Sequence, residues 1–123
     1  MSQDFKDFKE WLKELKKESR GAIILVEGKN DKRALNKFSI ENIPDLSGKR
    51  FSDIPDLLEG KWKKVVLLFD LDPHGERINQ KIKELLSSQG FIVEEKFRNF
   101  LKKLNIIHIE DINGGENEKV KDS

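Results

Sequence analysis

The sequence has no cysteine and no tyrosine, and it contains only three prolines and one methionine in 123 residues. Without cysteine the chain cannot form disulfides, thiolate metal sites or a cysteine nucleophile, and without tyrosine it has no tyrosine nucleophile. No apolar run approaches the ~20 residues of a membrane span, and the N-terminus has no apolar signal core. We therefore expect a soluble, cytoplasmic protein that does not interact with a membrane.

An excess of charge of one sign is also missing. The chain carries 24 Lys and Arg against 23 Asp and Glu, which gives a net charge of +1 although 38% of the residues are charged. This balance excludes polyanion binding driven by bulk charge, but it does not exclude a local basic patch. The length suits one domain, with no room for a large additional substrate-recognition module.

Strand and helix patterns alternate along the chain. Short apolar runs predict strands at residues 22–26, 65–69 and 91–93, with two further short strands near 43–46 and 106–109. Apolar residues at steps of three and four predict helices over 3–19, 31–38, 73–89 and 97–104. Ser52 and Pro55 are expected to open a further short helix that runs through Leu57 and Leu58 and ends at Gly60. This alternation indicates an α/β fold with a mostly parallel sheet of about four to five strands, flanked by helices.

The domain organisation follows from the same pattern. Residues 1–20 are expected to form an extra N-terminal amphipathic helix, 21–112 the α/β domain, and 113–123 a flexible polar tail. Phe5, Phe8 and Trp11 give the N-terminal helix a large apolar face. We expect this face to pack on the sheet, and docking to a partner or a second copy is the alternative.

Acidic residues directly follow two of the strongest predicted strands. Glu27 follows AIILV, and Asp70 and Asp72 follow VVLLF in the stretch VVLLFDLDPHGE. Neighbouring parallel strands deliver their carboxyl ends to the same edge of a sheet, so the three carboxylates would meet there. Mg²⁺ would relieve their repulsion, because it binds one or two carboxylates together with waters and phosphate oxygens. The sequence predicts a Mg²⁺ site, with Mn²⁺ as the alternative ion.

Each acid also has a structural explanation. Asp72 before Pro73 suits a helix N-cap with proline at the first helical position. Glu27 could be a solvated turn residue, and Asp70 could be a half-buried carboxylate with a structural partner. Glu76 is expected to stabilise the N-terminus of the following helix.

The two acidic stretches resemble a known domain. VEGKND, followed by FDLDPHGERIN after a later strand, resembles the Toprim domain, the metal-binding α/β module of type IA and type II topoisomerases, bacterial-type primases, certain nucleases and small stand-alone proteins. The family pattern is a Glu after one strand and Asp-x-Asp after a later one, and Glu27, Asp70 and Asp72 match it. The resemblance covers roughly residues 21–112, and the spacing D-x-D-x-x-G-E is most similar to the topoisomerase and maturation-ribonuclease branches.

The chain also departs from parts of this family. Type IA topoisomerases usually carry a third acid at the position of His74, and a topoisomerase needs the tyrosine that this chain lacks. Primases need flanking domains for which there is no room. The resemblance therefore leaves a small stand-alone Toprim protein, or a nuclease similar to the ribosomal-RNA-maturing ribonucleases.

The resemblance implies a Mg²⁺-dependent, nuclease-like enzyme that acts on nucleic-acid phosphodiesters in RNA processing or nucleic-acid repair, alone or as a subunit of a larger complex. It makes Asp70 and Asp72 metal ligands, and it makes Glu27 the general acid or base and a further ligand. RNA is favoured over DNA as the partner, and a protein partner or a homodimer is compatible with this function. The alternative is a non-catalytic, metal-dependent module that binds nucleic acid or protein.

Basic and aromatic residues give two sets of candidate nucleic-acid contacts. The set beside the acids consists of Lys29, Lys32, His74 and Arg77, since helix starts and cations suit phosphate. The second set, in two basic stretches, consists of Trp62, Lys63, Lys64, Arg98 and Lys102. For both basic stretches, a solvated helix face is the competing interpretation.

Overall fold

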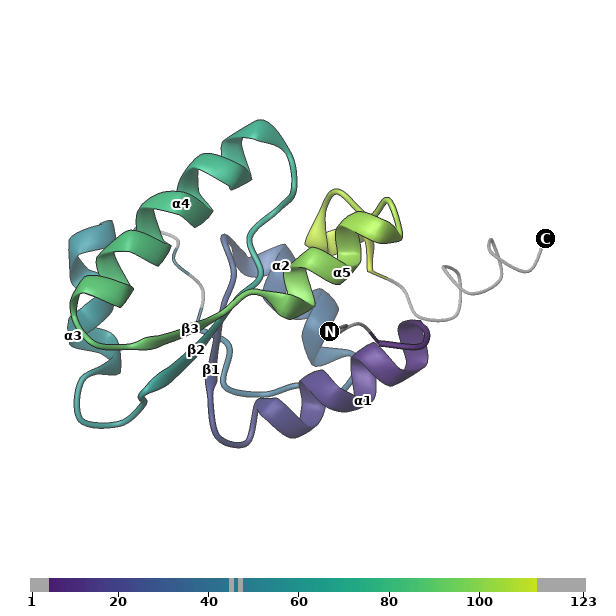
Figure 1. Ribbon diagram of the computed structural model, residues 1–123, viewed down its shortest axis with the longest axis horizontal. Helices are drawn as coiled ribbons and strands as arrows, with labels where there is room; N and C mark the ends of the chain where they lie inside the picture. The colour runs from purple at the N-terminus through teal and green to yellow at the C-terminus, as the bar shows by residue number, and fades with distance from the viewer. Residues whose placement is uncertain (1–4, 45, 47, 113–123) are drawn as a thin grey trace.

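The computed structural model describes residues 5–44, 46 and 48–112, and Figure 1 shows its arrangement of strands and helices. The helices are α1 (Phe8–Glu18), α2 (Lys29–Asn36), α3 (Ile54–Leu58), α4 (Pro73–Ser88) and α5 (Lys96–Lys103). The strands are β1 (Ile23–Leu25), β2 (Lys64–Leu67) and β3 (Ile92–Glu94). Two 3-10 turns, η1 (Phe51–Asp53) and η2 (Ile109–Asp111), complete the order.

The three strands form one parallel sheet in the order β1-β2-β3. Ile23 pairs with Val65 across the first strand pair, and Val65 pairs with Val93 across the second. The central strand is apolar and solvent-inaccessible from Val65 to Leu67, as expected of a strand covered on both faces. The predicted α/β architecture with a parallel sheet and flanking helices is confirmed.

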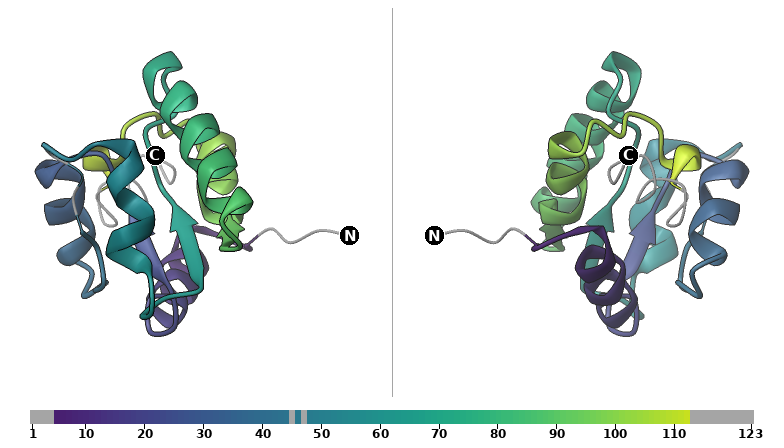
Figure 2. Two further views of the ribbon diagram at one scale, coloured as in Figure 1. Left: turned by 90° about the vertical axis from the view of Figure 1, so that its left-hand side faces the viewer. Right: turned by 90° about the vertical axis from the view of Figure 1, so that its right-hand side faces the viewer.

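Helices cover both faces of the sheet, as Figure 2 shows. Alternate strand residues point to opposite faces. Ile24 and Val66 join one apolar cluster with side chains of α1, α2 and α5. Val65 and Leu67 join a second cluster with side chains of α3 and α4. The sheet is therefore packed on both faces, and this packing holds the turns that follow β1 and β2 in place.

The N-terminal helix packs against this domain. Phe8, Trp11 and Leu15 are at most 1% exposed, and the indole N–H of Trp11 donates to the Phe97 carbonyl at 2.9 Å. Phe5 stacks on Phe97 with ring centroids 5.1 Å apart. The apolar face that could have served for docking is used within the chain.

Two predicted strands are wrong, so the described residues form three strands rather than four or five. Near residues 43–46, Asn42 accepts one hydrogen bond from Ile24 N–H, but Pro44 has no N–H to continue a ladder, and residue 45 lies outside the described residues. At 106–109, Leu71 N–H donates to the Ile107 carbonyl at 2.7 Å, and the chain then turns into η2. Isolated hydrogen bonds fix both segments without making them strands.

The helix boundaries differ slightly from the predicted ones. Helix α1 begins at Phe8, because the Asp7 side chain caps it by accepting from Glu10 N–H. Helix α2 begins at Lys29 rather than after Asn30, with Gly28 as its N-cap. Residues 1–4 of the predicted first helix and the whole predicted tail, 113–123, lie outside the described residues. No helix in the described ranges combines the length and the apolar character needed to cross a membrane.

Candidate metal centre

The acids lie at the carboxyl edge of the sheet. Glu27 follows β1, and Asp70 and Asp72 follow the apolar continuation of β2. Because β1 and β2 are adjacent and parallel, the two turns come to the same edge.

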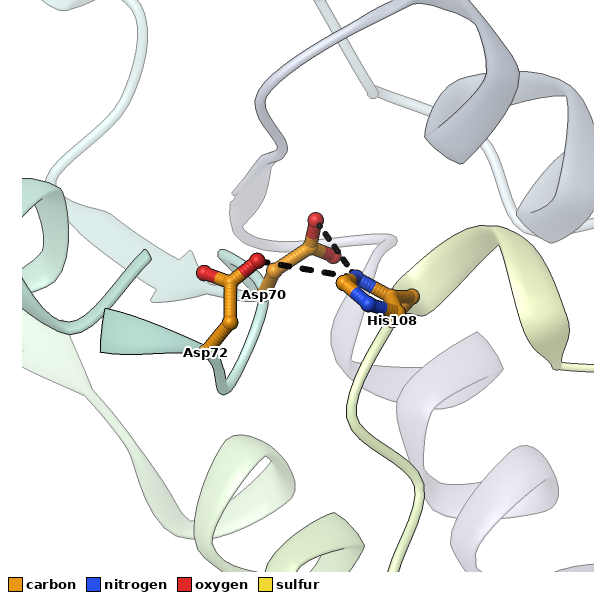
Figure 3. Close-up of side chains that lie close together, drawn as sticks. All are labelled: Asp70, Asp72 and His108. Carbon is orange, nitrogen blue, oxygen red and sulfur yellow. Dashed lines mark hydrogen bonds and ion pairs between the residues drawn. The ribbon is translucent and has the colours of Figure 1, made fainter. Parts of the chain in front are cut away.

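Asp70, Asp72 and His108 form a close group, with one potential ligand atom of each lying within 4.8 Å of the others (Figure 3). Asp70 Oδ1 accepts from Ile109 N–H at 2.8 Å, and Asp72 Oδ1 accepts from Gly75 N–H at 2.7 Å. The Oδ2 atoms of the two aspartates lie 3.4 Å and 3.7 Å from His108 Nδ1. Each carboxylate therefore accepts a backbone hydrogen bond through one oxygen and has its other oxygen beside His108 Nδ1.

The negative charges of Asp70 and Asp72 affect the pKa of His108. A hydrogen bond to Asp70 raises the pKa of the imidazole, burial opposes this, and the charges of Asp70, Asp72 and Asp111 raise it further. The two carboxylates thus favour the protonated form of the ring over the neutral form. The aspartates favour a cation at this position.

Glu27 occupies a separate part of the edge. Its Oε2 lies 2.9 Å from His74 Nε2, and the Glu27 side chain is 30% exposed. Glu27 is outside the three-residue group around His108. The structure therefore brings Asp70 and Asp72 together and pairs Glu27 with His74.

Arg98 fixes the turn that carries the aspartates. Its guanidinium donates to the carbonyl oxygens of Phe69 at 2.8 Å and Asp70 at 2.6 Å, and it pairs with Glu76 at 3.3 Å. Arg98 is 2% exposed. This burial corrects the sequence prediction that Arg98 contacts nucleic acid, since its donors are directed into the protein.

Gly75 allows the same turn to close. A Cβ atom at this position would lie 2.0 Å from the Asp70 carbonyl oxygen, closer than any side chain tolerates. The first turn of α4 therefore packs directly against the backbone of Asp70. Only glycine permits this approach.

Asp31 is a buried acid next to the site. Burial, followed by the charge of Asp70, raises its pKa to about 6, although a hydrogen bond from Gly28 N–H acts in the opposite direction. The sequence analysis did not single out Asp31. Its place at the third position of α2, four residues after Glu27, could have identified it, because the first turn of this helix follows the acidic turn directly.

The predicted cations are distributed over both ends of the sheet. Lys29 and Arg77 are exposed and Lys32 is half-buried on the helices that follow the acidic turns. Lys102 pairs with Glu76 at 3.6 Å. Trp62, Lys63 and Lys64 lie at the opposite edge, where β2 begins, and Lys64 pairs there with Glu18.

His108 was missed because the sequence analysis treated residues 106–109 only as a strand. Asp70 holds Ile109 N–H, which directs the preceding residue to the acidic edge. The sequence offered no direct signal for this position, because His108 lies within the apolar run IIHI and the hydrogen bond that places it is non-local.

The model of the Toprim domain matches residues 22–108. The chain belongs to the Toprim domain family. A UPF0292 protein of Archaeoglobus fulgidus is 34% identical over 78% of this chain and 76% of its own length. A UPF0292 protein of Pyrococcus abyssi is 33% identical over 90% and 85%, respectively.

Two solved structures resemble this chain. A putative protein from Aquifex aeolicus is 74% identical, with a TM-score of 0.86 over 88% of this chain and 100% of that one. The zinc-binding and RNA polymerase domains of the Aquifex aeolicus primase are 29% identical, with a TM-score of 0.50 over 75% of this chain and 24% of that one. Membership of this family relates the fold to nucleic-acid-associated, metal-binding proteins.

Proposed function

We propose that this Toprim protein is a divalent-metal-dependent enzyme that cleaves nucleic-acid phosphodiester bonds, with RNA as the favoured substrate. The supporting observation is that the Oδ2 atoms of Asp70 and Asp72 both lie beside His108 Nδ1, at 3.4 Å and 3.7 Å, at the carboxyl edge of the sheet. Both aspartates are held by backbone N–H groups through their other oxygen. This arrangement provides two preoriented carboxylate ligands.

The donor set suits the proposed ion. Carboxylate oxygens and water are ligands of Mg²⁺ and Mn²⁺, and imidazole nitrogen is accepted more readily by transition metals. Asp70 and Asp72 would hold Mg²⁺, and His108 would add a nitrogen donor when Mn²⁺ is the ion. A bound ion supplies charge neutralisation at phosphate oxygens and acidifies a bound water.

The surrounding residues take complementary roles in this proposal. Glu27 serves as the general acid or base, and its 2.9 Å contact with His74 Nε2 positions its carboxylate. Lys29, Lys32 and Arg77 bind the phosphates that flank the reacting bond, because they lie near the starts of the helices next to the acids. In this arrangement Asp70 and Asp72 bind the metal ion, and Glu27 transfers the proton.

Cleavage of labelled single-stranded RNA and DNA, with Mg²⁺, Mn²⁺ or EDTA, tests this function. We expect metal-dependent cleavage that the double variant Asp70→Asn/Asp72→Asn abolishes and that Glu27→Gln lowers about 10²- to 10⁴-fold. Asp56→Asn, an exposed acid on α3, is the matched control and should keep wild-type activity. Metal-dependent binding without cleavage would instead support a non-catalytic binding module, and cleavage that survives in EDTA would contradict the proposal.

A further inference from the structure

A cavity of about 380 Å³ lies at the sheet edge opposite the acids. Its lining residues belong to two turns, the one that leads from α3 into β2 and the one that leads from α4 into β3. Figure 1 shows the course of both turns. Lys64 begins β2 and Asp70 follows it six residues later, so the two edges are roughly 20 Å apart at about 3.3 Å per residue. The cavity is therefore separate from the candidate metal centre.

The walls of the cavity combine aromatic rings with cations. Trp62 and Phe91 line it and pack against the apolar cluster beneath α3 and α4. Lys61 and Lys63, the chain neighbours of Trp62, line it as well, and Glu59 is the acid among the lining residues. The two cations outnumber that acid.

The turns that carry these side chains are held in shape. Trp62 N–H donates to the Leu58 carbonyl at 3.0 Å, and Gly60 adopts a positive φ of 79° at the end of α3. Opposite them, Phe91 N–H donates to the Leu86 carbonyl at 3.0 Å. The Trp62 ring therefore has a fixed base on which a ligand can stack.

Several donors in the cavity are unused within the described part of the chain. The Trp62 indole N–H and the ammonium groups of Lys61 and Lys63 make no hydrogen bond or ion pair with a described residue. An aromatic platform flanked by free cationic donors suits a flat base attached to phosphate. An apolar ligand would leave these donors without acceptors.

We infer that this cavity is a second binding site, at which single-stranded nucleic acid stacks a base on Trp62 and places its phosphates against Lys61 and Lys63. The site needs neither the metal nor Glu27. Because a positive aromatic groove tracks a strand without reading its sequence, the site would bind single strands of differing sequence. It would give this nearly neutral chain a local affinity for nucleic acid that its net charge does not supply.

Tryptophan fluorescence tests the inference directly. The chain has two tryptophans, and Trp11 is fully buried, so a ligand that quenches fluorescence by contact reports on Trp62. A short oligouridine titrated in EDTA should quench the emission saturably, and it should do so equally in the Asp70→Asn/Asp72→Asn variant. Inorganic phosphate and AMP, at matched phosphate concentration, should quench far more weakly.

Anisotropy of a labelled oligouridine measures the same binding without relying on tryptophan emission. Trp62→Leu should weaken the affinity about tenfold, and Trp62→Phe should restore part of it. Lys61→Gln/Lys63→Gln should make the slope of log affinity against log salt shallower by about 1.4, since each phosphate contact contributes about 0.7 on single strands. Lys81→Gln, an exposed lysine on α4, is the matched control and should leave the slope unchanged.

Four results would overturn the inference. In the fluorescence experiment, these are an absence of quenching by oligouridine, equal quenching by AMP, and quenching that changes with the protein concentration but not with the oligouridine concentration. In the anisotropy experiment, it is binding that is lost in the Asp70→Asn/Asp72→Asn variant but retained in the Lys61→Gln/Lys63→Gln variant. Absence of nuclease activity has no bearing on this experiment, because it is performed without metal. A failure here likewise leaves the proposed chemistry at the acidic edge intact.

Discussion

The β1–α2 turn and the β2–α4 turn begin alike in sequence, each with an apolar strand followed by an acid, but the structure constrains them very differently. In the first turn, Glu27 contacts the exposed His74, and Gly28 has open space where a Cβ would stand. In the second, Asp70 is held by Ile109 N–H and by Arg98, and Gly75 packs against its backbone. The rigid turn suits fixed metal ligands, and the open turn suits a group that must meet a substrate.

Alanine substitutions at Gly75 and Gly28 should give the largest difference in stability between the two turns. Gly75→Ala should lower the free energy of unfolding by about 3 kcal/mol, because its Cβ would collide with the Asp70 carbonyl and the backbone must shift. Gly28→Ala should cost about 1 kcal/mol or less, since this N-cap has an extended backbone and free space. Urea denaturation of both variants measures the difference. Equal losses would show that the two turns are constrained alike.

Two cations on α5, one buried and one exposed, test whether Arg98 holds the second turn in place or acts only through its charge. Arg98→Gln should lower the free energy of unfolding by about 2–3 kcal/mol, because the carbonyls of Phe69 and Asp70 lose their buried donors. Lys102→Gln should change it by about 0.5 kcal/mol or less, since its ion pair with Glu76 is exposed. Thermal unfolding of both variants tests this. An Arg98 variant as stable as wild type would contradict the anchoring role.

This contrast also shows what the sequence could predict. Continuous apolar runs identified all three strands, and the acids after them identified the edge at which Glu27, Asp70 and Asp72 gather. The role of Arg98 was not predictable, because KFRNFLKK reads equally well as a basic surface, and only tertiary packing buries its second cation. His108 depended on a non-local hydrogen bond, from Ile109 N–H to Asp70, which no local pattern encodes.

Asp31 provides a smaller, pH-dependent test of the acidic edge. Burial raises its pKa in the folded protein to about 6, so the folded state holds a proton that the unfolded state has already lost between about pH 4 and pH 6. The stability that Asp31 contributes in EDTA, relative to Asp31→Asn, should therefore fall as pH rises through this window, by up to about 3 kcal/mol for a shift of about two pKa units. Asp31→Asn should flatten this part of the profile, measured by urea denaturation from pH 4 to pH 7. An identical pH profile in the variant would show that the pKa of Asp31 is not raised in the folded protein.

Titration of Mg²⁺ and Mn²⁺ followed by amide NMR tests the central claim most directly. We predict saturable shifts at residues 70–75 and 107–109, which Asp70→Asn/Asp72→Asn abolishes and Glu27→Gln leaves largely in place. Mn²⁺ should broaden the same resonances and bind more tightly, because His108 adds an imidazole donor. The absence of binding at millimolar metal, or binding centred on Glu27 and insensitive to the aspartate variant, would contradict the assignment of the metal to the rigid turn.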